Sequence, residues 1–174
     1  NYPSVANKIA PVIASIFSPL VLLTLVVYLV FVGVIGKDPF QDRDFLLVFN
    51  LLLLGVMAII VFSVSETSND SRQRFNEWIL LILSVVTLFV DLLALSAILY
   101  RLGEYGFTPN RVAVLGSNLL IFGNLLLITI DLFRVNLQNG NIKRVEKRIA
   151  AYLPVYMGWT IFMVFVLPFL FGFK

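Results

Sequence analysis

Long apolar runs alternate with short polar segments along the chain. The most prominent runs cover residues 77–100 and 112–133, and the polar joint 101–111 lies between them. A helix that crosses a hydrocarbon layer about 30 Å thick needs about 20 residues, at a rise of about 1.5 Å each. Both runs are long enough, so residues 77–134 predict a transmembrane helical hairpin. We expect the other helices to be organised around it.

The complete pattern predicts an all-α, polytopic transmembrane helical bundle that forms one domain over residues 1–174. Residues 1–17 and 137–151 are expected to lie at the membrane interface. We expect about five spans, at residues 19–36, 45–64, 77–100, 110–134 and 152–173. No segment shows the strict two-residue alternation of a transmembrane barrel. Because the first residue is Asn rather than Met, we expect the chain to be part of a longer protein.

Prolines and glycines predict where the helices begin and end. Pro19 and Pro154 are expected in first turns, where the missing N–H costs nothing. A first helix that began near Pro11 would instead be kinked at Pro19. Gly103 is the expected stop of the third span. Thr108, which is followed by a proline, is the expected N-cap of the fourth.

The composition agrees with a chain embedded in lipid. Hydrophobic residues make up 60% of the sequence, charged residues only 13%, and the mean hydropathy is +0.96. In soluble domains about a quarter of the residues are charged. The net charge of +3 is too small to suggest a nucleic-acid partner.

The absence of cysteine and histidine excludes whole classes of chemistry. Cys- and His-based nucleophiles, zinc sites and His-ligated haem need these residues, so we expect no metal and no cofactor. Catalysis would need paired carboxylates. Counted along the helices, Asp131 lies roughly 18 Å closer to the cytoplasm than Asp91. We therefore expect that the chain is not an enzyme.

Asp91 is the first candidate site residue, because it lies deep within the third span. A charged Asp near the bilayer centre costs about 2.5–3.5 kcal/mol, so it should face the bundle and either find a donor or become protonated. Counted from the ends of the two runs, Asn118 lies at the same depth in the fourth span. Thr87 and Asn124 share a level one to two turns deeper.

Two interpretations of this polar site stay open. It handles protons or ions between spans three and four, or it provides interhelical hydrogen bonds, assisted by close backbone approach at Gly116 and Gly123. Nearer the cytoplasmic end, Asp131 and Arg134 are expected to form a headgroup-level ion pair of little energetic weight.

A basic segment precedes the fifth span. Its apolar residues, Ile142, Val145 and Ile149, share one helical face, and its cations are Lys143, Arg144, Lys147 and Arg148. This pattern predicts a helix that lies on anionic lipid headgroups. An aromatic belt at the membrane interface is expected to follow, formed by Tyr152, Tyr156 and Trp159.

The distribution of Lys and Arg predicts the orientation. With five spans, eight of these residues fall on the side of the N-terminus and five on the other. The positive-inside rule then places the N-terminus in the cytoplasm and the C-terminus outside. We expect a bacterial inner-membrane protein whose partners are the lipid bilayer and anionic headgroups. Other membrane subunits or a homo-oligomer stay open.

The polar joint is the second candidate site. Its glycines permit a tight turn, and its charged and hydroxyl side chains either close a hairpin or bind a phosphate or carboxylate at the start of the next helix. The residues concerned are Arg101, Glu104, Tyr105, Thr108 and Arg111.

The joint resembles a motif, roughly Arg-x-x-Glu-Tyr-Gly-x-Thr-x-x-Arg, of an uncharacterised bacterial membrane family, domain of unknown function 4153. Tyr2-Pro3 and Pro19-Leu20 also look like parts of that family, whereas Phe107 and Pro109 depart from its usual residues. The resemblance covers nearly all of this chain and implies that it is the C-terminal portion of a protein with more spans. It implies no activity.

The sequence therefore favours a non-catalytic scaffold or assembly module in the membrane. The alternative is a transporter or proton-coupled component that uses Asp91 with Asn118 and Asn124.

Overall fold

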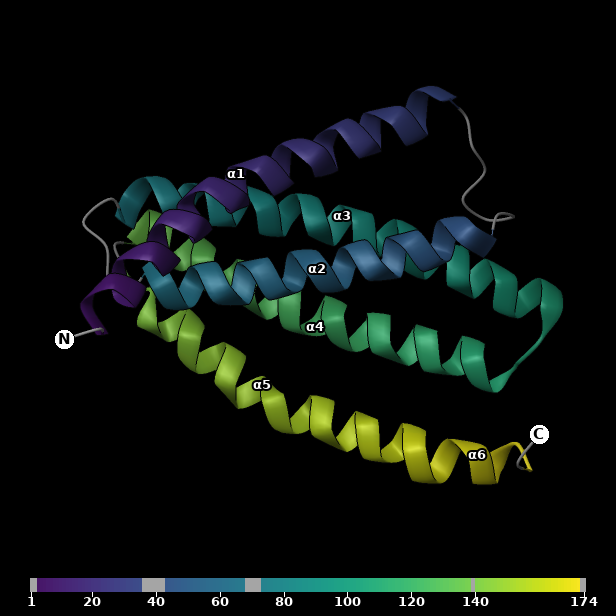
Figure 1. Ribbon diagram of the computed structural model, residues 1–174. Helices are drawn as coiled ribbons and strands as arrows, with labels where there is room; N and C mark the ends of the chain where they lie inside the picture. Colours follow the sequence, from purple (N-terminus) through teal and green to yellow (C-terminus); the bar gives the residue numbers. More distant parts are fainter. Residues whose placement is uncertain (1–2, 36–42, 68–72, 139, 173–174) are drawn as a thin grey trace.

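The computed structural model describes residues 3–35, 43–67, 73–138 and 140–172. In order, the helices are α1 (Pro3–Ile35), α2 (Arg43–Thr67), α3 (Gln73–Tyr105), α4 (Pro109–Gln138) and α5 (Lys143–Ile161), as Figure 1 shows. A π-helical turn, η1 (Phe162–Val166), and the short α6 (Leu167–Leu170) continue α5 without a break. No strand occurs in these described ranges. The predicted all-α fold class is confirmed.

Within the described ranges, three helical stretches are long and apolar enough to cross a membrane. They are Arg74–Tyr105, Pro109–Gln138 and Lys143–Leu170, and an 18-residue window within each has a mean hydropathy of 2.6, 2.0 and 1.9 respectively. The described side chains of α1 and α2 add the shorter apolar stretches Ile16–Val30 and Asn50–Val64. This pattern fits a chain embedded in a membrane.

The α3–α4 hairpin forms the centre of the bundle. The contact between α3 and α4 is the most extensive in the molecule, and α3 also contacts α1 and α2 (Figure 1). At the end opposite the joint, the Asn136 Nδ2 donates to the Glu77 carbonyl at 3.2 Å. The two helices are therefore antiparallel over their full length, as predicted.

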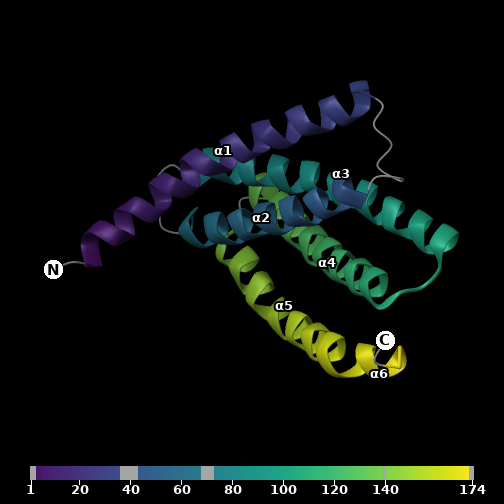
Figure 2. The same cartoon turned by 45° about the vertical axis from the view of Figure 1, so that its right-hand side comes forward.

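The apolar core lies between α1, α2, α3 and α4. Its fully buried side chains include Leu25, Leu53, Ile60, Leu83 and Leu125, which come from all four helices. By contrast, α5 lies at the edge of the bundle, where it contacts α4 and α2. Figure 2 shows that α5 and α6 diverge from α4 toward the C-terminus. Most of this last helix is consequently exposed to the surroundings of the protein.

The joint begins later than predicted. The α3 helix continues through Gly103 to Tyr105, and the helix stop is Gly106, which has a φ of +73°. Its N–H bonds to the Leu102 carbonyl at 3.0 Å. A positive φ is what favours glycine at this position. The predicted cap is confirmed, because the Thr108 Oγ1 accepts from the Arg111 N–H at 3.4 Å.

The first and fifth helices begin earlier than the prolines predicted. The first helix begins at Pro3, so Pro11 and Pro19 lie inside it, and the predicted interfacial segment and first span form one continuous helix. Likewise, Pro154 lies inside α5, which joins the basic segment to the fifth span. An internal proline removes one backbone bond, but in lipid a continuous helix still satisfies all the other backbone groups.

Candidate functional site

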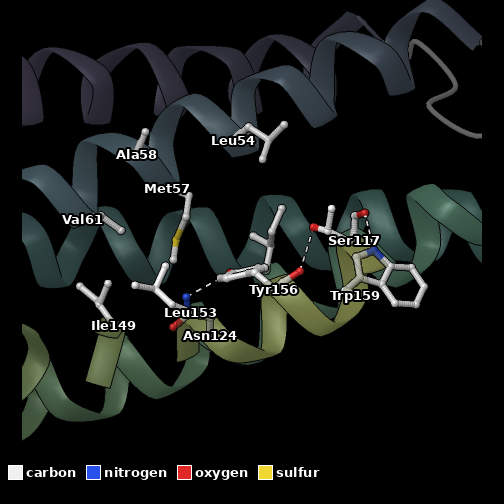
Figure 3. A pocket seen from close by; sticks show the side chains of 12 residues that line it. Leu54, Met57, Ala58, Val61, Ser117, Asn124, Ile149, Leu153, Tyr156 and Trp159 are labelled. Carbon is white, nitrogen blue, oxygen red and sulfur yellow. Dashed lines mark hydrogen bonds between the residues drawn. The ribbon is translucent and has the colours of Figure 1, made fainter. Parts of the chain in front are cut away.

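A row of polar side chains joins α4 to α5. Ser117, Asn124 and Asp131 are spaced seven residues apart on α4, which places them on one face of the helix. Each binds a side chain of α5: the Trp159 Nε1 donates to the Ser117 Oγ at 3.0 Å, the Asn124 Nδ2 to the Tyr156 hydroxyl at 3.0 Å, and the Arg148 Nε to the Asp131 Oδ2 at 2.8 Å. We call these three pairs the polar ladder; Figure 3 shows the first two.

The two glycines of α4 make room for the aromatic rings of α5. A methyl group added at Gly116 would overlap the ring of Trp159, and one added at Gly123 would lie 2.9 Å from the Tyr152 hydroxyl. The expectation that these glycines let α3 and α4 approach is therefore wrong. The glycines instead contact Trp159 and Tyr152 of α5, which the sequence predicted to belong to an aromatic belt. The Tyr152 and Tyr156 rings pack edge to face, with their centroids 5.2 Å apart.

Asn118 does not meet Asp91. Its Nδ2 donates to the Asn50 Oδ1 of α2 at 2.7 Å. The error follows from the end of α3: with Tyr105 rather than residue 100 as the last helical residue, Asp91 lies five residues deeper below the joint than the sequence suggested. That shift moves Asp91 about 7.5 Å along the helix, past the level of Asn118.

Asp91 is a buried carboxyl group on α3. Its side chain is fully buried, and neither carboxyl oxygen has a hydrogen-bond partner among the described residues. The Oδ1 of Asn124 is also without a partner in the described part of the chain. The Tyr156 hydroxyl accepts the Asn124 Nδ2 donor and carries an O–H donor of its own. Asp91 and Asn124 are thus two buried side chains with unpartnered oxygens in the described structure, and the second is bonded to Tyr156.

Thr87, the fourth predicted member of this site, is buried but makes no hydrogen bond to Asp91, Asn118 or Asn124. Its hydroxyl donates to the Leu83 carbonyl of its own helix at 2.6 Å. Such back-bonding satisfies a threonine inside an apolar helix without a partner on another helix. The interhelical role that the sequence suggested for Thr87 therefore falls to Tyr156.

A groove of about 430 Å³ runs between α2, α4 and α5 (Figure 3). Two members of the polar ladder, Ser117 and Asn124, lie on its α4 side, and Tyr156 and Trp159 lie on its α5 side. The remaining lining is apolar apart from Thr160 and comprises Leu54, Met57, Ala58, Val61, Ile121, Ile149 and Leu153. The signal for this interface was present in the sequence as the seven-residue spacing of Ser117, Asn124 and Asp131.

The joint is closed by Arg111. Its Nη1 donates to the carbonyls of Tyr105 and Gly106 at 2.7 and 2.8 Å, and its guanidinium lies 5.5 Å from the Tyr105 ring centroid. Glu104 is exposed and makes no ion pair with a described arginine. The side chain of Arg101 is half-buried. Arg111 thus stabilises the turn itself, which agrees with the hairpin interpretation of the joint.

Asp131 is more deeply placed and better paired than predicted. Its side chain is fully buried, and Arg148 at 2.8 Å and Arg144 at 3.6 Å are closer to it than Arg134 at 3.7 Å. The expected pair with Arg134 is therefore the longest of three contacts to a buried carboxylate. The sequence missed this because Arg144 and Arg148 come from the next helix.

The apolar face of the basic segment packs on protein. Ile142 and Val145 are buried in the core of the bundle, whereas Lys143 and Lys147 are exposed. The predicted apolar face therefore exists, but Ile142 and Val145 pack against the core of the bundle.

Metal chemistry has no ligand set in the described ranges, where no three acidic side chains come together as a metal site. No protein-family model matches the chain, and no curated protein or solved structure shows significant similarity to it.

Proposed function

We propose that the chain is a non-catalytic scaffold or assembly module within the membrane. The observation that carries this proposal is the polar ladder, in which three evenly spaced side chains of α4 are each bonded to α5. Two further contacts act in the same way: the buried Ser18 and Ser63 hydroxyls are 2.7 Å apart between α1 and α2, and the partly buried bond from Asn118 to Asn50 joins α4 to α2. Among the described residues, the buried side chains that bond to another helix thus include Ser18, Ser63, Asn118, Asn124 and Asp131.

The energetics support a structural role for these contacts. In a membrane, helices gain little from burying apolar surface against one another, because lipid tails are equally apolar. Hydrogen bonds between helices contribute about 0.6 kcal/mol each on average, and close packing at small residues adds to this. The polar ladder with Gly116 and Gly123 supplies both contributions at the edge helix α5, which has few other contacts.

The proposed location is a bacterial inner membrane, with the N-terminus in the cytoplasm and the C-terminus outside. The excess of Lys and Arg on the side of the basic segment supports this orientation. Membership of the bacterial family named above is also a proposal, supported by the residues of the joint. The chain would then act with other membrane segments or with further copies of itself.

Thiol labelling tests the structural role of the polar ladder. Val145 is fully buried where α5 begins, and the chain has no cysteine of its own. We expect a thiol introduced by Val145→Cys to react slowly with a maleimide, and several-fold faster when Ser117→Ala and Asn124→Leu are added. As a control, Thr129→Val removes only a bond within α4 and should leave the rate unchanged. Equal rates in all three proteins would contradict the proposal.

We propose a proton- or cation-coupled membrane component as the second candidate. The specific observation in its favour is Asp91, whose two buried oxygens have no donor among the described residues. A polar group buried without a partner costs about 1–3 kcal/mol in protein mutagenesis. Such a cost is hard to explain by scaffold function alone, since a leucine would fit a helix interface at no such cost. Asn124 and Tyr156, rather than Asn118, would be its partners.

Flux measurements separate the two candidates. The purified chain is reconstituted into vesicles, and proton or sodium flux is followed with an entrapped dye while thermal stability is measured in parallel. If the second candidate is correct, Asp91→Leu keeps or raises the stability but abolishes the flux. If wild-type vesicles show no flux above that of Asp91→Leu vesicles, the result contradicts the second candidate and favours the scaffold.

A further inference from the structure

Three arginines surround a single buried carboxylate at one end of the bundle. The Asp131 carboxyl is fully buried, and it lies 2.8 Å from the Arg148 Nε, 3.6 Å from the Arg144 Nε and 3.7 Å from the Arg134 Nη1. Arg134 comes from α4, and Arg144 and Arg148 come from α5. One carboxylate neutralises only one of the three cations, so the group carries a formal charge of +2.

Most of the donors in this group are unused. A guanidinium has five N–H donors, yet Arg148 is the only one of the three whose guanidinium makes a hydrogen bond to a described residue. The side chains of Arg134 and Arg144 are 45% and 58% exposed, so their donors can be reached from outside. The exposed guanidinium groups of Arg134 and Arg144 therefore lie beside the carboxylate with N–H donors that no described residue accepts, and the Asp131 Oδ1 likewise has no hydrogen-bond donor in the described part of the chain.

We propose that Arg134, Arg144 and Arg148, oriented by Asp131, bind a phosphate group carried by a membrane lipid or by a soluble ligand. Planar guanidinium groups bind phosphate through paired N–H donors, and the excess positive charge matches the charge of a phosphate. This site goes beyond the proposed scaffold function and does not depend on it.

The position of the site suits a lipid headgroup. Asp131 lies seven residues before the end of α4, and Arg148 lies five residues after the start of α5. At the helical rise, both are about 10 Å or less from the helix ends, where headgroups are found. Basic pockets between transmembrane helices are a known way of binding phospholipid headgroups.

The site differs from a general attraction between a basic helix and an anionic surface. Lys143 and Lys147 belong to the same basic segment, but neither contacts Asp131 in the described structure. If only net charge mattered, the two lysines would contribute as much as the arginines. If the oriented guanidinium groups matter, the lysines are dispensable.

Native mass spectrometry of the purified chain with phosphatidic acid, and with phosphatidylcholine for comparison, tests this distinction. The decisive variant, Arg134→Lys with Arg144→Lys, keeps every charge but removes the planar donors and leaves the Arg148–Asp131 bond intact. We expect it to bind phosphatidic acid at least ten-fold more weakly than the wild type. The control, Lys143→Gln with Lys147→Gln, removes two charges, and we expect its affinity to stay within about two-fold. Phosphatidylcholine should bind all three proteins equally.

Two results would overturn the proposal: an unchanged affinity for phosphatidic acid in the arginine-to-lysine variant, or an equal loss in the lysine-to-glutamine control. Thermal unfolding of each variant shows whether it is folded, and the single variant Arg144→Lys, with a smaller expected loss, replaces the double one if that fails to fold. Titration with glycerol phosphate shows whether the bound phosphate group belongs to a lipid or to a soluble ligand. Binding of glycerol phosphate that depends on Arg134 and Arg144 indicates a soluble ligand, and binding of phosphatidic acid alone indicates a headgroup.

Discussion

Asp91 and Asp131 are both buried, but their carboxyl groups have very different surroundings. Both side chains are fully buried. Asp131 has a hydrogen bond and two further cations within 4 Å, whereas Asp91 has no hydrogen-bond donor among the described residues. A buried charge with well-placed partners contributes to fixing the structure, whereas an unpaired polar group costs stability. Asp131 is thus suited to a structural role and Asp91 to a functional one.

Replacing the arginines around Asp131 one at a time should give graded losses of stability. We expect Arg148→Met to lower the Tm more than Arg144→Met, because Arg148 donates a 2.8 Å bond and Arg144 lies at 3.6 Å. Both side chains are partly exposed, so the difference comes mainly from the buried carboxylate that loses its donor. Thermal unfolding in detergent measures it. Equal Tm values for the two variants would show that the Arg148 bond has no special weight.

At the scale of single residues, the sequence predicted which polar side chains are buried better than it predicted which side chains they contact. Asp91 and Asn124 were expected inside the bundle, and both are buried. The expected Asp91–Asn118 contact failed because it depended on counting from a helix end that was five residues too early. The apolar run ends at residue 100, but the helix continues to Tyr105, and this difference alone was enough to shift the expected contact.

The helix end itself can be tested with two neighbouring glycines. Gly106 has a φ of +73°, whereas Gly103 lies inside α3, and an added methyl at either position meets no atom within 4 Å. We expect Gly106→Ala to destabilise the protein by about 1–2 kcal/mol, because alanine tolerates a left-handed backbone poorly. Gly103→Ala should stabilise it by about 0.5–1 kcal/mol through helix propensity. Equilibrium unfolding measures both, and a reversed order would restore Gly103 as the stop.

The contact between α4 and α5 depends on the absence of a side chain at Gly116. We expect Gly116→Ala to displace the Trp159 ring, break its bond to Ser117 and lower the Tm. Gly55→Ala is the matched control, since Gly55 is also helical and an added methyl there meets no atom within 4 Å. That control should raise the Tm slightly through helix propensity. A Tm for Gly116→Ala as high as that of the control would place Trp159 elsewhere.

At the scale of helices, the apolar runs predicted correctly that each helix is present but predicted poorly where the helices begin and end. The hairpin and the helical character of all the runs followed from length and hydropathy alone. The starts of α1 and α5 did not, because Pro19 and Pro154 looked like first-turn residues and instead lie inside longer helices. Proline has a fixed φ that suits both positions, so the residue alone does not distinguish them.

The arrangement of the whole molecule was the least predictable from sequence. In lipid, a helix has no need to turn its apolar residues inward, so hydrophobic periodicity does not show which faces pack together. The α5 helix illustrates this, since most of its apolar side chains are exposed and its contacts to α4 are made by Arg148, Tyr152, Tyr156 and Trp159. The central claim is therefore that polar and aromatic side chains dock α5 on α4 in one register.

Cross-linking in native membranes tests this register most directly, because the chain has no cysteine of its own. Cysteines are introduced in pairs, and a bifunctional thiol reagent that bridges only directly facing helix positions is added. We expect Ser117→Cys with Trp159→Cys to cross-link efficiently, and Ser117→Cys with Tyr152→Cys, about 10 Å away along α5, to cross-link at least ten-fold less. Equal yields from the two pairs, or a higher yield from the second, would contradict the docking of α5 by the polar ladder.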